Sequence, residues 1–144
     1  MKRNRLRRRT RSSHWRSRRA RTGAAVVGVL RVGAGLGMAL RPETVPRILG
    51  VDTVSARRMG WLVQMCAVRD AALGAGGLHA AVTGRDVRPW LLAQAFSDAG
   101  DAVAVGLALR RRQVAPVRAL AVGAAAVAGM VGGLVASRDA GPQV

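Results

Sequence analysis

The chain lacks the residues that most soluble cores and disulfide frameworks depend on. It has no tyrosine, one phenylalanine and one cysteine among 144 residues. Soluble cores normally bury large areas with aromatic side chains, so their scarcity argues against a water-soluble core. The lone Cys66 excludes an internal disulfide. Because only His14 and His79 accompany it, we expect no conventional zinc site.

Residue patterns that carry catalysis are also lacking. We find no nucleophile–base pair, no metal-ligand cluster and no glycine loop placed to cradle phosphate. The glycine string 33–37 (GAGLG) lies inside an apolar segment instead of following a strand. We therefore expect no enzyme activity, no metal and no cofactor.

Small apolar residues dominate what is present. Half of the chain is apolar, and it contains 18 glycines. Glycine weakens a water-exposed helix by about 1 kcal/mol relative to alanine, whereas transmembrane helices use it freely because small residues let backbones approach. Four apolar segments of near-spanning length follow one another, at 24–40, 59–82, 90–109 and 119–136. All five prolines fall outside them.

These segments predict an all-α fold, an antiparallel four-helix transmembrane bundle with a disordered basic N-terminal arm. The expected divisions are the arm at 1–22, a membrane domain at 23–137 and a tail at 138–144. Between the first two segments, 42–50 (PETVPRILG) is either a short interfacial helix or a plain loop, and Asp52 is placed to cap the second segment.

Two further patterns concern helix ends and helix crossings. Trp61 and Trp90 begin the second and third segments, so in an antiparallel arrangement they would anchor opposite interfaces. Glycines spaced four apart in the first and last segments suggest close helix crossings, and these are Gly33, Gly37, Gly129 and Gly133.

The N-terminal arm concentrates the positive charge. Eleven of the 24 basic residues lie in the first 21 positions, too much like charge for the arm to fold alone. One hypothesis places it on anionic lipid headgroups at the cytosolic surface. A second is sequence-blind nucleic-acid binding, which we disfavour because no recognition module accompanies it. A third is that the arm does little, or reflects a wrongly chosen translation start.

Charge also bears on orientation. Four spans put both termini on one side, which then carries 14 basic residues against 8 on the other. The excess predicts a multi-pass protein of the cell inner membrane with cytoplasmic termini. Without the arm the count is 3 against 8 and the prediction reverses.

Five ionisable residues lie well inside the apolar segments: Arg31, Arg69, Asp70, Asp98 and Asp101. Each would cost roughly 2.5–3.5 kcal/mol if it faced lipid at mid-depth, so such residues usually turn inward and pair. At about 1.5 Å rise per residue, antiparallel neighbours bring Arg69 level with Asp101 and Arg31 level with Asp70. We expect one mid-bundle network that fixes helix register, or alternatively a polar pathway, since one carboxylate is in excess.

A family resemblance rests on these same positions. The pattern Arg69-Asp70-x-x-x-Gly74 followed by Asp98-x-x-Asp101 resembles a family of small bacterial four-helix integral membrane proteins, a domain of unknown function. The motifs Arg31-x-x-x-Gly35 and Pro46 with Leu49-Gly50-Val51 fit it as well. The resemblance covers 24–136, and it implies a membrane protein without implying an activity.

The sequence thus predicts a small integral membrane protein with a structural or interaction role. Its partners would be the bilayer, anionic headgroups through the arm, and a second copy or another membrane protein. One alternative is a small proton or cation channel or carrier subunit that uses Asp98 and Asp101. Another is a soluble, basic, helical nucleic-acid-binding protein.

Overall fold

The described part of the chain consists of helices and the short connections between them. The computed structural model describes the backbone of residues 3–140 and the side chains of residues 18–140. Within that range there is no strand, which confirms the expected all-α class. Residues 3–140 form six helices instead of four: α1 (Arg3–Leu40), α2 (Thr44–Ile48), α3 (Thr53–Arg58), α4 (Gly60–Val82), α5 (Arg88–Arg110) and α6 (Pro116–Ala140).

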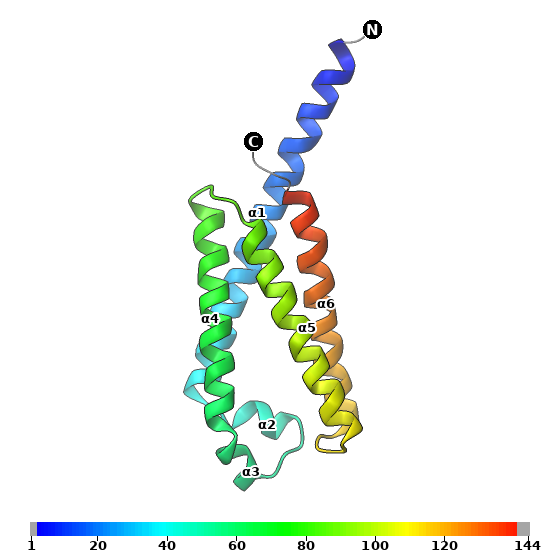
Figure 1. Ribbon diagram of the computed structural model, residues 1–144. Coiled ribbons are helices and arrows are strands. Elements are labelled where there is room, and N and C mark those ends of the chain that lie inside the picture. The colour runs from blue at the N-terminus through cyan, green and yellow to red at the C-terminus, as the bar shows by residue number, and fades with distance from the viewer. Residues whose placement is uncertain (1–2, 141–144) are drawn as a thin grey trace.

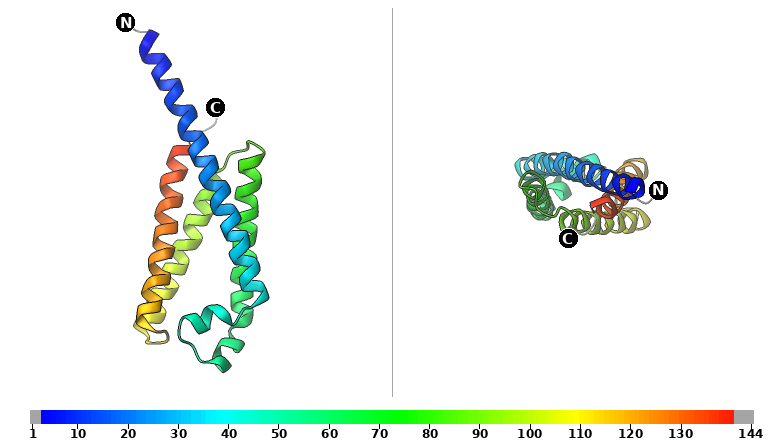
Figure 2. Two further views of the ribbon diagram at one scale, coloured as in Figure 1. Left: turned by 180° about the vertical axis from the view of Figure 1, so that it is seen from behind. Right: turned by 90° about the horizontal axis from the view of Figure 1, so that it is seen from above.

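The four long helices lie side by side, and successive long helices run in opposite directions (Figure 1). They form two closely packed pairs, α1 with α4 and α5 with α6, while α4 contacts α5 only sparsely. The N-terminal part of α1 projects beyond the other helices (Figure 2). The short helices α2 and α3 lie at the opposite end, near the connection between α5 and α6 (Figure 1).

Helix α1 extends further than expected, because it begins at Arg3 and so includes most of the arm predicted to be disordered. Once a helix is nucleated, each further residue adds one hydrogen bond, and arginine is a good helix former. The apolar segment 24–40 can therefore support a helix that continues back into the arm. Residues 1–2 of the arm and 141–144 of the tail lie outside the described part, and α6 includes the first three residues of the expected tail.

The connection between α1 and α4 contains two short helices. Helix α2 lies within the segment 42–50, where a short helix or a loop was expected. Asp52 caps α3 and not α4, because its carboxylate accepts hydrogen bonds from the backbone N–H groups of Val54 and Ser55, both at 3.0 Å. Hydrogen bonds from Ser55 hold the pKa of Asp52 below its usual value of 3.8.

Close helix packing depends on glycines, although not on all those expected. A Cβ at Gly28 would lie 2.7 Å from the Gly74 carbonyl oxygen, and one at Gly35 would lie 2.7 Å from the Ala67 carbonyl oxygen. Gly33 and Gly37 make no such crossing within the described residues, since a Cβ at either would meet nothing within 4 Å. Spacing alone does not say which face of a helix is buried.

On α6 the expected glycines do face a neighbour. A Cβ at Gly133 would lie 3.1 Å from the Ala95 Cβ atom of α5. A Cβ at Gly129 would overlap the carboxylate of Asp98 and lie 3.0 Å from its Cγ atom. Both glycines therefore allow α6 to approach α5 closely.

Large apolar side chains lie mainly outside and small ones inside. The buried apolar cluster comprises Ala20, Ala24, Ala80, Val87, Leu91 and Ala140, with Leu91 its only large, fully buried member among the described residues. By contrast, Phe96 is 84% exposed, and many valines and leucines of the long helices are also exposed. Two stretches, Arg18–Leu40 and Pro116–Ala140, are long and apolar enough to cross a bilayer.

Candidate functional site

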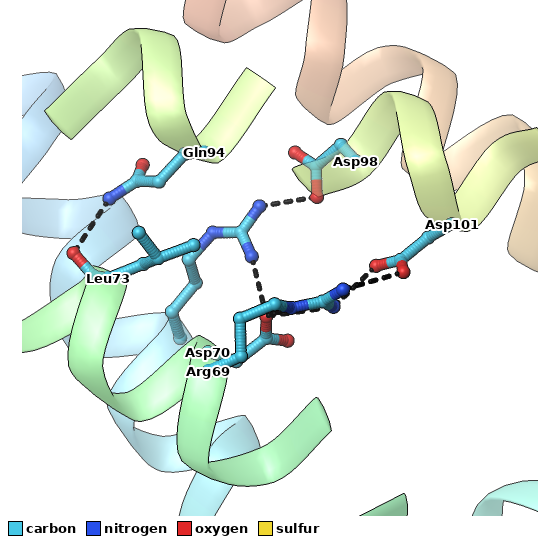
Figure 3. A network of polar contacts seen from close by, with 7 residues as sticks. Arg69, Asp70, Leu73, Gln94, Asp98 and Asp101 are labelled. Atoms are coloured by element: carbon cyan, nitrogen blue, oxygen red, sulfur yellow. Dashed lines mark hydrogen bonds and ion pairs between the residues drawn. The ribbon is translucent and has the colours of Figure 1, made fainter. Parts of the chain in front are cut away.

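Five charged side chains from three of the long helices lie close together (Figure 3). They come from α1, α4 and α5 and alternate in sign, in the order Asp98, Arg31, Asp70, Arg69 and Asp101. We call this set the ionic chain. Each sequential pair of residues in it makes an ion pair, so two guanidinium groups connect three carboxylates.

Arg31 on α1 joins two other helices. Its Nη1 atom donates to Asp70 Oδ1 of α4 at 3.1 Å, and its Nη2 atom donates to Asp98 Oδ1 of α5. Because α4 and α5 contact each other only sparsely, this bridge is a principal polar connection between the α1/α4 and α5/α6 pairs.

Arg69 on α4 makes the second bridge. It binds both carboxylate oxygens of Asp101 on α5, at 3.0 Å and 2.8 Å, a bidentate geometry that suits the planar guanidinium. It also donates to Asp70 Oδ1 from Nε at 3.3 Å and from Nη2 at 3.2 Å. Asp70 therefore accepts hydrogen bonds from both arginines.

Burial differs along the ionic chain. The side chains of Arg31, Asp70 and Asp98 are 13–15% exposed, whereas those of Arg69 and Asp101 are 37% and 39% exposed. The Asp98 end of the ionic chain is thus enclosed by helices, whereas its Asp101 end is exposed at the surface. The enclosed end lies against α6, because Asp98 packs on Gly129.

Two residues near the ionic chain were not singled out from the sequence. Gln94, one helical turn before Asp98, is 2% exposed, and its amide nitrogen donates to the Leu73 carbonyl oxygen of α4 at 3.1 Å. The buried hydroxyl of Ser97 has no hydrogen-bond partner within residues 18–140. The four-residue spacing from Gln94 to Asp98 is a signal that places both on one helix face.

The two expected interface tryptophans have different surroundings. Trp61 begins α4 and is 61% exposed, while Trp90 begins α5 at the opposite end and is partly buried against the apolar cluster (Figure 1). A Cβ at Gly76 would overlap the six-membered ring of Trp90, so the indole packs directly against a glycine of α4.

The ionic chain offers charges and hydrogen bonds but no set of metal ligands. No group of three or more His, Cys, Asp or Glu side chains within the described range could hold a metal ion. Comparison of the chain with protein-family models, with curated proteins and with solved structures found no match in any of the three.

Proposed function

We propose that the chain is a small multi-pass integral membrane protein with a structural or interaction role and no catalytic activity of its own. The carrying observation is the location of its apolar side chains. In the apolar 18-residue stretch within Arg18–Leu40, only 17% is buried, and in the corresponding stretch within Pro116–Ala140 only 6% is buried. Core helices of soluble proteins are mostly buried, whereas helices in lipid expose their apolar side chains to the hydrocarbon.

The proposal includes α4 and α5 as spans. Each has 23 residues, which at 1.5 Å per residue is about 34 Å, enough for a hydrocarbon core of about 30 Å. Each of the two helices carries two charged residues of the ionic chain, Arg69 and Asp70 on α4 and Asp98 and Asp101 on α5. The ion pairs lower the cost of those charges, which supports their placement at mid-depth.

In this role the ionic chain would set the register of the helices. Lipid gives helices no hydrophobic reason to associate, so small-residue packing and interhelical polar contacts must hold them together. Glycines provide close packing within the α1/α4 and α5/α6 pairs, and the ionic chain connects the pairs. A buried polar network that fixes register and partner order is a well-attested use of such groups.

Alkaline carbonate extraction of membranes tests the proposal. We expect the full chain to stay in the pellet, and to need detergent for a monodisperse preparation. Release into the supernatant, or a monodisperse protein in plain buffer, would overturn the proposal and favour the soluble nucleic-acid-binding alternative. A salt-dependent shift with unrelated nucleic acids would then test that alternative.

The proposed location is the cell inner membrane with both termini cytoplasmic. The first described residues of α1 and the last of α6 lie toward the same end (Figure 1), and the arm adjoining α1 carries eleven basic residues. Reporter domains fused to each terminus test this orientation. Activity of a reporter that works only outside the cytoplasm, fused to either terminus, would refute it.

A second candidate function, a small proton or cation channel or carrier subunit, is favoured by the charge of the ionic chain. Three carboxylates against two guanidinium groups leave a net charge of −1, which a proton or a cation would neutralise. The partnerless Ser97 hydroxyl next to Asp98 adds a polar group that water could satisfy.

Flux into proteoliposomes separates the two candidates. The variants Asp98→Asn and Asp101→Asn keep the shape of the side chain and remove its charge. If the wild type conducts ions, and the variants assemble but conduct none, the channel or carrier is favoured. If the wild type conducts nothing and the variants lose assembly, the structural role is favoured.

A further inference from the structure

An open cavity of about 530 Å³ lies where α2 passes the start of α6. Its lining residues are Thr44, Arg47, Ile48 and Arg118. Two of the four carry guanidinium groups and none carries a carboxylate. We call it the α2–α6 cavity. It lies at the end of the molecule opposite to the projecting part of α1 (Figure 1).

The two walls of the α2–α6 cavity are tied together. The Nη1 atom of Arg118 donates to the Ile48 carbonyl oxygen at 3.3 Å. Beside it, the Ala115 N–H donates to the Leu49 carbonyl oxygen at 2.9 Å. The backbone segments that carry Arg47 and Arg118 are therefore held side by side by the fold, although the two residues are far apart in the sequence.

Gly50 makes this tie possible. It has φ +88°, and a Cβ there would lie 2.9 Å from the Ala115 Cβ atom. A side chain at Gly50 would strain the backbone and push the two connections apart. The same close approach positions Arg118 over α2.

Charge around the cavity has one predominant sign. The two segments that meet at this end, 41–58 and 110–118, contain eight arginines and two acids, a net charge of +6. The arginines are Arg41, Arg47, Arg57, Arg58, Arg110, Arg111, Arg112 and Arg118. Such a field attracts anions to this end of the molecule.

We propose that the α2–α6 cavity binds a phosphate-bearing anion, either a phospholipid headgroup or free phosphate. Arg47 and Arg118 supply paired N–H donors that match phosphate oxygens, and the Thr44 hydroxyl adds a third donor. Ile48, which is 54% exposed, gives the cavity an apolar wall that suits the glycerol and first methylene groups of a lipid. The lipid form of the proposal rests on the proposed membrane location.

Native mass spectrometry of the full chain in detergent tests this site. The probes are phosphatidylglycerol, phosphatidylcholine and inorganic phosphate. The variant Arg47→Gln/Arg118→Gln removes both cavity guanidinium groups. The matched control, Arg57→Gln/Arg58→Gln, removes the same charge from exposed positions on α3.

We expect retention of phosphatidylglycerol to fall by about tenfold or more in the cavity variant, because charge-assisted hydrogen bonds are lost. In the control it should fall by less than about threefold, because only screened surface charge is lost. Gly50→Val should mimic the cavity variant without any change of charge, which makes the result independent of net charge.

The three probes distinguish a lipid headgroup from free phosphate as the bound anion, and they also show whether the site exists. Selective loss of phosphatidylglycerol supports a lipid site, and equally selective loss of inorganic phosphate supports a soluble ligand. Equal effects of the cavity and control variants, no binding of either anion, or equal retention of phosphatidylcholine would overturn the site. Carbonate extraction tests the membrane location separately, and the inorganic phosphate arm does not depend on it.

Discussion

Replacing Arg31 by glutamine should test the ionic chain most directly. Asp98 has Arg31 as its only ion-pair partner within the described range, and both side chains are 13% exposed. Arg31→Gln therefore leaves the Asp98 carboxylate buried without a counter-ion. It also changes the net charge of the ionic chain from −1 to −2. Breaking a buried pair in this way costs about 3–5 kcal/mol, a large part of the roughly 5–15 kcal/mol that stabilises a typical protein.

A second substitution makes the prediction quantitative. Adding Asp98→Asn to Arg31→Gln removes the unpaired carboxylate and returns the charge of the ionic chain to −1. The double variant should therefore be more stable than the sum of the two single effects by about 1–3 kcal/mol, the usual coupling between residues in contact.

The assay is denaturant unfolding of the detergent-solubilised chain, followed by the fluorescence of its three tryptophans. Arg57→Gln, at an exposed position on α3, is the matched control and should change the free energy of unfolding by less than about 0.5 kcal/mol. The reasoning is refuted if Arg31→Gln is no more destabilising than this control, or if the double variant shows strict additivity.

Three further predictions concern packing and capping. Gly74→Ala should destabilise the chain by about 1–3 kcal/mol, because its Cβ would lie 2.7 Å from the Gly28 carbonyl oxygen, whereas Gly33→Ala should be neutral or stabilising in thermal unfolding. Equal effects of the two would contradict the close α1–α4 packing. Gly76→Ala should displace the Trp90 ring and shift the tryptophan emission, which an unchanged spectrum would contradict. Asp52 should titrate below pH 3.8 by carboxyl NMR, so its capping contribution persists at neutral pH and is lost only as the pH falls below that value; titration at or above 3.8 would refute the cap.

The ionic partners were accessible from the sequence because depth along a helix depends only on residue count. At a fixed rise per residue, Arg69 and Asp101 stand at equal heights in antiparallel helices, and the structure pairs them at 2.8 Å. Arg31 and Asp70 lie level for the same reason and are 3.1 Å apart. The additional pair of Arg31 with Asp98 depends on how the helices are arranged around the centre, which height does not reveal.

The rotation of each helix was harder to predict. Gly33 and Gly37 were chosen by their spacing, yet the glycines that pack are Gly28 and Gly35, three residues before and four residues after Arg31. These positions share the face of the buried arginine. On α1, spacing relative to the buried arginine would therefore have identified the packing glycines, whereas spacing between glycines succeeded only on α6, at Gly129 and Gly133.

The sequence patterns also did not predict the break between the short helix α3 and the long helix α4. The apolar segment that begins at Met59 looked continuous with its cap at Asp52, but the structure inserts α3 and begins α4 at Gly60. The helical arm was not expected either. Its many arginines indicate charge repulsion, but composition does not reveal that a helix can propagate into the arm from the adjoining apolar segment.

The distribution of the five ionic residues along the chain has a consequence for assembly. The first half of the protein contributes Arg31, Arg69 and Asp70 to the centre, a charge of +1, and the second half contributes Asp98 and Asp101, a charge of −2. Each half alone would hold an unbalanced charge at its helix contacts, while the opposite charges of the two halves attract each other. Two separately expressed fragments, cut at the exposed turn around Gly84, should therefore recognise each other and reassociate.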